Sequence, residues 1–138
     1  MFTPFCYRAW VKKMDWPTGQ LITAPDKVIS DGDSGYMFAD LGRRGYDNTR
    51  FRLFGVNTPE TNSSDPEMRK KAYESRDWLR TKILGKEVFY RSMGYEDKYG
   101  RILPIIWTTE VDFGNAALSV NKQMLDLGLA VAYMGELI

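Results

Sequence analysis

In the first half of the chain, short apolar and aromatic runs alternate with clusters of turn residues, a pattern typical of β-strands. The runs predict strands over residues 6–13, 36–41 and 50–56, with a short apolar segment at 27–30. Residues 15–26 contain two prolines and a glycine, and we interpret them as an inserted loop. This half of the chain therefore indicates a β-rich fold.

The spacing of apolar residues changes to a helical period after residue 64. Ser64 stands three residues before Glu67, which is the spacing of a capping box, and Pro66 falls in the first turn, where its missing N–H does no harm. The apolar positions that then recur at helical intervals are Met68, Ala72, Leu79 and Ile83. Gly85 follows where a C-terminal cap belongs. These signals predict one long helix.

The remainder of the chain mixes both patterns. Strands are predicted over residues 87–91 and 102–108, a second helix over 119–127 and an extended segment over 129–133. The order of strands, helix, strands and helix lacks the regular alternation of βαβ winding. It fits a mainly β (α+β) protein, a five-stranded OB-fold barrel with Greek-key connections and two helices. The length and the absence of internal repeats favour a single domain over residues 1–138.

Composition narrows the chemistry that such a domain can perform. Hydrophobic residues make up 43% and charged residues 27% of the chain, which is globular rather than disordered composition. The chain has no histidine, and Cys6 is its only cysteine. An internal disulfide, an imidazole metal site and Ser-His-Asp or Cys-His catalysis are therefore excluded. Catalysis would use carboxylates, Arg, Lys, Tyr or a hard metal, and the net charge of +1 argues against nonspecific coating of DNA.

Three polar segments stand at predicted turns or strand ends. They are Asp31-Gly32-Asp33, Asn57-Thr58-Pro59-Glu60 and Asp97-Lys98-Tyr99-Gly100-Arg101. Taken alone, each fits an ordinary turn or strand exit. Arg52 is different, because it places a permanent cation inside an apolar strand pattern. It must reach a barrel edge or find an anion, although an outward-facing strand position explains it about equally well.

In combination these segments resemble the staphylococcal nuclease (thermonuclease) family. The matching blocks, in the family's order and at about its spacing, are Asp31-Gly32-Asp33-Ser34, Arg52-Leu53-Phe54-Gly55-Val56-Asn57-Thr58-Pro59-Glu60-Thr61, Asp97-Lys98-Tyr99-Gly100-Arg101, and Val120-Asn121 through Gly128-Leu129-Ala130 with Val131-Ala132-Tyr133 following. The resemblance covers residues 27–133, with residues 6–13 as a weaker candidate for the family's first strand. It implies the family's OB-type fold without its C-terminal helix, because the sequence ends soon after Tyr133.

The resemblance implies a set of metal ligands. Asp33 matches the family's calcium-binding aspartate, Thr58 matches a residue whose backbone carbonyl helps to hold the metal, and Asp31 matches an acidic residue close to it. Asn57 departs from the family, which commonly has a second carboxylate ligand there. Its amide oxygen can coordinate calcium but brings no charge. We expect weaker calcium binding, compensation by Asp31 or a water, or loss of the metal.

The resemblance also implies residues that bind and cleave the phosphodiester. Arg52 and Arg101 match two arginines that clamp phosphate, and Glu60 matches the glutamate usually assigned as general base. Guanidinium forks can bind phosphate oxygens more strongly as negative charge accumulates, and a carboxylate can orient or deprotonate the attacking water. The residues that match neighbours of the nucleotide in the family are Lys98, Tyr99 and Tyr133.

The sequence therefore predicts a calcium-dependent nuclease that hydrolyses DNA, RNA or both and prefers unpaired strands. A catalytically weak or inactive nucleic-acid-binding OB module is the alternative that Asn57 favours, and a protein-interaction barrel is a third possibility. Joint retention of Asp33, Arg52, Glu60 and Arg101 favours the enzyme. We expect a monomer or homodimer without a membrane partner. Since residues 1–10 do not resemble a secretory signal, we expect a cytoplasmic protein, with a plasmid- or phage-encoded origin left open.

Overall fold

The computed structural model describes residues 7–41, 45–96 and 100–133. The strands in this part of the chain are β1 (Tyr7–Trp10), β2 (Lys13–Asp15), β3 (Gln20–Ile22), β4 (Ile29–Asp31), β5 (Ser34–Asp40), β6 (Tyr46–Arg52), β7 (Val56–Asn57), β8 (Glu87–Glu96), β9 (Arg101–Trp107) and β10 (Val131–Ala132). The helices are α1 (Pro25–Val28), α2 (Pro66–Ile83), the 3-10 helix η2 (Ala116–Leu118) and α3 (Val120–Asp126).

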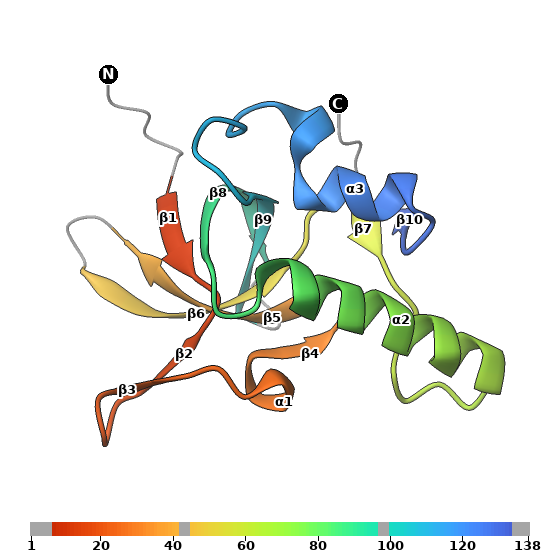
Figure 1. Cartoon of the computed structure of the whole chain (residues 1–138), viewed down its shortest axis with the longest axis horizontal. Helices are drawn as coiled ribbons and strands as arrows, with labels where there is room; N and C mark the ends of the chain where they lie inside the picture. The colour runs from red at the N-terminus through yellow and green to blue at the C-terminus, as the bar shows by residue number, and fades with distance from the viewer. Residues whose placement is uncertain (1–6, 42–44, 97–99, 134–138) are drawn as a thin grey trace.

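Five of the strands close into a ring. β1 pairs with β5 and with β8, β5 pairs with β6, and β8 pairs with β9, all antiparallel, while β6 and β9 complete the ring with a parallel pairing. This cyclic order is that of an OB-type Greek-key barrel, and the strands curve around a common interior in Figure 1. The predicted fold class is confirmed. β4 adds a further strand beside β5.

The interior of the ring is filled by side chains from alternate strand positions. Those that are fully buried include Ala9, Val11, Met37, Ala39, Phe51, Val88 and Ile106. The buried side chain of Asn121 connects α3 to this core by hydrogen bonds. Its amide accepts a hydrogen bond from the Ile106 N–H (3.1 Å) and donates to the carbonyls of Phe54 (2.9 Å) and Pro104 (3.1 Å). This buried amide is well satisfied, so it can fix α3 against β9 without a desolvation penalty.

The segment interpreted from the sequence as an inserted loop, residues 15–26, is more ordered than predicted. β2 and β3 form a hairpin in which Asp15 lies opposite Gln20, and α1 follows it. The hairpin is held against β6 by Asn48, whose side chain accepts from the Met14 N–H (2.7 Å) and donates to the Met14 carbonyl (2.9 Å). Strands of three residues depend on such long-range contacts, which local composition does not reveal. α1 is also an additional helix, because the sequence predicted only two.

The strand predicted over residues 50–56 is interrupted. β6 ends at Arg52 and β7 begins at Val56, and Gly55 in the turn between them has φ +76°. That left-handed conformation is one that glycine adopts without a steric penalty. The turn matters for the site because it brings Asn57 back toward Arg52.

α2 begins one residue later than the capping-box spacing predicts. Asp65, not Ser64, is the N-cap, and its carboxylate accepts a hydrogen bond from the Glu67 N–H at 3.0 Å. Three of the four predicted apolar positions are buried, namely Ala72, Leu79 and Ile83. Met68 is the exception at 39% exposure, because it lies on the wall of a hollow rather than in the core.

The remaining predicted elements agree with the structure to within a few residues. β5, β8, β9 and α3 occupy the segments expected for them, although β8 runs to Glu96 rather than ending at residue 91. β1 starts at Tyr7, and Cys6, at the start of the predicted first strand, lies outside the described residues. No helix in the described ranges is both long and apolar enough to span a bilayer.

Candidate active site

Asp33 is a buried carboxylate at the tight turn between β4 and β5, with its side chain only 10% exposed. Its Oδ1 accepts a hydrogen bond from the Ser34 hydroxyl (3.0 Å), and its Oδ2 accepts one from the Thr58 backbone N–H (3.2 Å). Its backbone carbonyl accepts from the Leu53 N–H (2.8 Å). A buried carboxylate needs such partners. These contacts fix Asp33 between β5, the end of β6 and the segment after β7.

Arg52 is the cation next to this carboxylate. It ends β6, and its Nη2 lies 3.8 Å from Asp33 Oδ2 and donates to Asn57 Oδ1 at 3.3 Å. Its guanidinium carbon stands 4.8 Å from the centre of the Tyr133 ring, a cation–π arrangement. The Arg52 side chain is 13% exposed. The prediction that this arginine must reach an edge or find an anion is confirmed, because its guanidinium lies beside the Asp33 carboxylate.

Arg101 joins the same cluster from the neighbouring strand. β6 and β9 pair in parallel with Arg50 opposite Arg101, so the start of β9 lies beside the end of β6. Arg101 Nη1 donates to the Ser34 hydroxyl at 3.3 Å, and that hydroxyl in turn donates to Asp33. Ser34 also lies opposite Arg52 in the β5–β6 register. Strand pairing therefore places Arg52 beside one buried carboxylate and links Arg101 to it through Ser34, which is a suitable arrangement for an anion such as phosphate.

The segment after β7 carries the other candidate groups, and these differ in burial. Thr58 is buried, and its hydroxyl has no hydrogen-bond partner among the described residues. Asn57 and Glu60 are exposed, and no contact of the Glu60 side chain is found in the described part of the structure. Thr61 closes the segment onto the turn, donating from its hydroxyl to Asp31 Oδ1 at 3.2 Å. The segment thus combines a fixed start with a solvent-facing carboxylate.

Gly32 allows the turn before Asp33 to pack closely against α2. A Cβ at this position would lie 2.7 Å from the Ser75 Cβ and 3.1 Å from the Thr58 Cγ2. At the first residue of β4, Arg80 of α2 donates to the Ile29 carbonyl from Nε (3.1 Å) and Nη2 (2.8 Å). We infer that a side chain at position 32 would displace the turn and with it the Asp33 carboxylate.

The oxygen groups at this turn are of the type that a calcium ion takes. Asp33 offers a carboxylate, Asn57 an amide oxygen and Thr58 a carbonyl oxygen and an unpartnered hydroxyl. Their charge is low, because no group of three or more His, Cys, Asp or Glu side chains that could hold a metal occurs among the described residues. These groups fit a hard cation in donor type but supply little negative charge to hold it.

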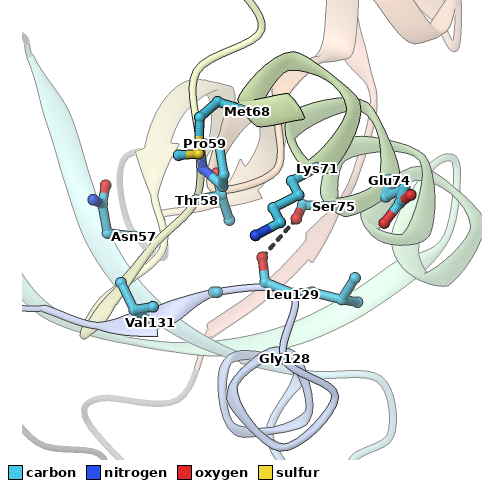
Figure 2. A pocket seen from close by; sticks show the side chains of 11 residues that line it. Asn57, Thr58, Pro59, Met68, Lys71, Glu74, Ser75, Gly128, Leu129 and Val131 are labelled. Carbon is cyan, nitrogen blue, oxygen red and sulfur yellow. Dashed lines mark hydrogen bonds between the residues drawn. The ribbon is translucent and has the colours of Figure 1, made fainter. Parts of the chain in front are cut away.

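A hollow of about 330 Å³ lies next to this cluster. In Figure 2 it is enclosed by the segment after β7, by α2 and by residues 128–131, and the Ser75 hydroxyl donates across it to the Leu129 carbonyl. Asn57 and Thr58 belong to its wall, whereas Arg52 and Arg101 do not. Lys71 is the cation that lines it, beside Glu74. We place the candidate site at the arginine cluster, because the hollow has a balanced charge and the cluster does not.

The structure brings most of the predicted site residues together. The cluster unites Asp33, Arg52, Asn57, Thr58, Arg101 and Tyr133, with Asp31 and Glu60 on adjoining segments. Lys98 and Tyr99 lie outside the described residues. Sequence reasoning assigned no role to Ser34, which links Asp33 to Arg101. Its place in the matching block Asp31-Gly32-Asp33-Ser34, directly after Asp33, was the available signal.

Comparisons with known proteins show the family of the chain. A family model described as "Staphylococcal nuclease homologue" matches residues 50–136. The chain is 31% identical over 97 residues to a probable endonuclease LCL3 from Kluyveromyces lactis, which covers 69% of this chain and 34% of that protein. It is 29% identical over 122 residues to a probable endonuclease LCL3 from Colletotrichum graminicola, covering 76% of this chain and 43% of that protein. The chain therefore spans less than half the length of these relatives.

Proposed function

Because the chain belongs to the family of staphylococcal nuclease homologues, we propose that it is a calcium-dependent nuclease that hydrolyses phosphodiester bonds of DNA, RNA or both. One observation carries the proposal, namely that Arg52 lies beside the buried Asp33 and that Arg101, from the neighbouring strand, is linked to it through the Ser34 hydroxyl. A scaffold has no need for two guanidinium groups and a carboxylate at one place. A site that binds a phosphodiester has such a need.

The two arginines would bind the phosphate. In hydrolysis a water oxygen forms a bond to phosphorus while an ester P–O bond breaks, and negative charge grows on the phosphate oxygens in between. Arg52 and Arg101 can donate to those oxygens, and their hydrogen bonds strengthen as the charge grows. Their positions are fixed in advance by strand pairing and by Ser34, so little reorganisation accompanies the reaction. This preorganisation would account for most of the rate enhancement.

Glu60 would act on the attacking water. Its side chain is exposed and has no partner among the described residues, so it is available to accept a proton or orient a water molecule. It is three positions after Asn57 on a segment whose start is fixed by Thr58, which keeps it close to the cluster. We assign it the general-base role on these grounds and on the family resemblance.

Asp33, Asn57 and Thr58 would hold the calcium ion, with Asp31 nearby. When bound, calcium supplies a positive charge that offsets the negative charge of the phosphate during hydrolysis. The neutral Asn57 lowers the charge of the ligand set, so the site would require calcium at a higher concentration than a site with two carboxylates.

The proposal is tested with a labelled single-stranded oligonucleotide incubated with the protein in millimolar calcium or in EGTA. We expect fragments in calcium and intact substrate in EGTA. Equal amounts of intact substrate in both conditions would contradict a calcium-dependent nuclease. Binding of the same oligonucleotide is measured by fluorescence anisotropy in EGTA, so that absence of cleavage is not confused with absence of binding.

A nucleic-acid-binding module without strong catalytic activity is the second candidate. The observation that favours it is Asn57, whose oxygen accepts a hydrogen bond from Arg52 rather than providing a second carboxylate. A module would bind the oligonucleotide in the anisotropy measurement and leave it intact at every calcium concentration. The two candidates therefore give different results in the same pair of assays.

A further inference from the structure

Four aromatic side chains form an unusual surface on the outside of the barrel, away from the hydrophobic core. We name Trp10, Trp16, Phe38 and Tyr46 the aromatic platform. The Trp10 and Tyr46 rings lie 5.8 Å apart, Phe38 and Tyr46 stack at 5.7 Å, and Trp16 and Phe38 lie 6.1 Å apart. Trp16 is 57% exposed and Tyr46 41% exposed. Large aromatic rings left exposed together on one surface indicate a binding function.

The platform is hollowed and has an apolar floor. A depression of about 300 Å³ is lined by Trp10, Phe38, Tyr46, Leu21 and Lys12. Leu21 comes from the β2–β3 hairpin, so the segment that was interpreted as a loop builds one wall of the depression.

Cations surround these aromatic rings. The Arg8 guanidinium lies 5.5 Å from the Trp10 ring, and the Lys13 ammonium lies 4.3 Å from the ring of Tyr36, the next outward residue of β5. Arg50 lies 6.0 Å from the same Tyr36 ring. Aromatic faces interleaved with Lys and Arg are what a single-stranded nucleic acid needs, because its bases stack and its phosphates are anionic.

Three carboxylates also belong to this surface, and each forms a hydrogen bond or ion pair with a neighbouring residue of the same surface. Asp47 accepts a hydrogen bond from the Trp16 indole N–H at 3.3 Å, and Asp40 accepts one from the Tyr46 hydroxyl at 3.4 Å. Glu87 pairs with Arg8 at 3.6 Å. Asp47 and Asp40 accept these hydrogen bonds at the polar edges of Trp16 and Tyr46, and the exposed parts of these two rings remain available for stacking.

The platform and the candidate active site share one face of the sheet. In the β5–β6 register, Ser34 is opposite Arg52, Tyr36 opposite Arg50, Phe38 opposite Asn48 and Asp40 opposite Tyr46. Residues two apart in a strand point to the same side, so Arg52 and Tyr46 project from the same face. Six residues of strand separate them, on the order of 20 Å. About six stacked nucleotides would cover this distance at 3.4 Å per nucleotide.

We propose that the aromatic platform binds unpaired bases of the same nucleic-acid strand whose phosphate is bound at Arg52 and Arg101. The proposal rests on the proposed function for the identity of the occupant. Unpaired bases are the expected ligand because bases in a duplex are already stacked and do not present free faces. The platform would make binding depend on strand length and would disfavour duplex substrates.

Binding of labelled oligothymidylates in EGTA tests the proposal without any cleavage. Wild type is compared with Trp16→Ala and Tyr46→Ala, using dT12 and dT2 as ligands. Because one stacked base contributes about 1–3 kcal/mol, we expect each substitution to weaken dT12 binding by about tenfold. The loss for dT2 should be much smaller, since two nucleotides do not reach from Arg52 to the platform.

Matched controls separate stacking from damage to the fold. Tyr73 on α2 is 42% exposed, nearly the same as Tyr46, and Tyr73→Ala should bind dT12 like wild type. Trp16→Phe and Tyr46→Phe keep an aromatic face and should retain most of the affinity. Thermal unfolding followed by circular dichroism confirms that every variant is folded.

The proposal is overturned if folded Trp16→Ala and Tyr46→Ala both bind dT12 within twofold of wild type, or if wild type does not bind dT12. Comparison of this binding measurement with the cleavage assay in calcium separates this outcome from failure of the proposed function. A protein that loses dT12 binding on Trp16→Ala but never cleaves DNA would support the platform and contradict the nuclease. Cleavage by wild type together with unaffected binding by the variants would do the reverse.

Discussion

Asp33 and Glu60 are the two carboxylates assigned to chemistry in this protein, and the fold holds them in opposite ways. Asp33 is 10% exposed, accepts two hydrogen bonds and lies beside Arg52. Glu60 is exposed, with no side-chain partner in the described ranges. A fixed, buried carboxylate is suited to holding cations in place. An exposed carboxylate without a partner is suited to orienting a water molecule or accepting its proton. The difference predicts that substitutions around Asp33 affect stability and activity together, whereas substitutions of Glu60 affect activity alone.

The largest effect is expected from Arg52→Ala. It removes a phosphate-binding group, for which we expect a loss of about 10³-fold in kcat/KM. It also leaves the buried Asp33 carboxylate without its cation, so the free energy of unfolding should fall by about 2 kcal/mol. Steady-state cleavage and urea unfolding measure the two quantities.

Arg52→Lys sharpens the first prediction. A lysine keeps a positive charge beside Asp33 but lacks the guanidinium fork, so stability should recover while most of the activity stays lost. Full activity in this variant would contradict the role of a bidentate phosphate contact.

Glu60→Gln should give the next largest effect on activity and almost none on stability. Loss of the proton acceptor is expected to lower kcat by about 10²-fold. The free energy of unfolding should stay within about 0.5 kcal/mol of wild type, as for exposed positions without partners. A destabilisation comparable with that of Arg52→Ala would mean that the two carboxylates do not differ as described.

The contrast between these carboxylates was only partly predictable from the sequence. The cation within a strand pattern marked Arg52 as unusual, whereas the Asp31-Gly32-Asp33 turn alone fitted an ordinary turn and only the family resemblance assigned Asp33 to the site. Burial of Asp33 follows from Gly32, which allows the turn to approach α2, and from the Thr58 N–H. Both are long-range contacts, and no local pattern encodes them.

The fold was predictable to a similar extent. Apolar runs between turn residues identified β5 and β9, and a helical period identified α2. The break after β6 and the β2–β3 hairpin were missed, because the first depends on a single glycine with φ +76° and the second on pairing with Asn48. The aromatic platform was missed for the same reason, since strand pairing brings together residues as far apart in sequence as Trp10 and Tyr46.

Asn57→Asp adds a negative charge next to Asp33 and should change the calcium requirement for cleavage by about tenfold. A second carboxylate would strengthen binding of calcium, so the calcium concentration for half-maximal cleavage should fall by about that factor. The control is Asn115→Asp, which adds the same charge at the exposed N-cap of η2. An unchanged calcium requirement in Asn57→Asp would remove position 57 from the metal site.

The smallest effect is expected from Ser34→Ala. The variant loses the hydroxyl that donates to Asp33 and accepts from Arg101, so it should lower the free energy of unfolding by about 1 kcal/mol and kcat/KM by about fivefold. Ser34→Thr keeps the hydroxyl and should restore part of both losses. Ser34→Ala is expected to lower stability and activity to a similar extent, whereas Glu60→Gln lowers activity alone, and this distinguishes a positioning residue from a general base.

The most direct test of the proposed chemistry is the single-turnover rate of cleavage of a labelled single-stranded 12-mer at saturating calcium, measured for wild type, Arg52→Ala and Glu60→Gln. We expect cleavage by wild type and rates at least about 10²-fold lower for both folded variants. Intact substrate with wild-type protein, or cleavage by either variant at the wild-type rate, would contradict the assignment of this cluster as a nuclease site.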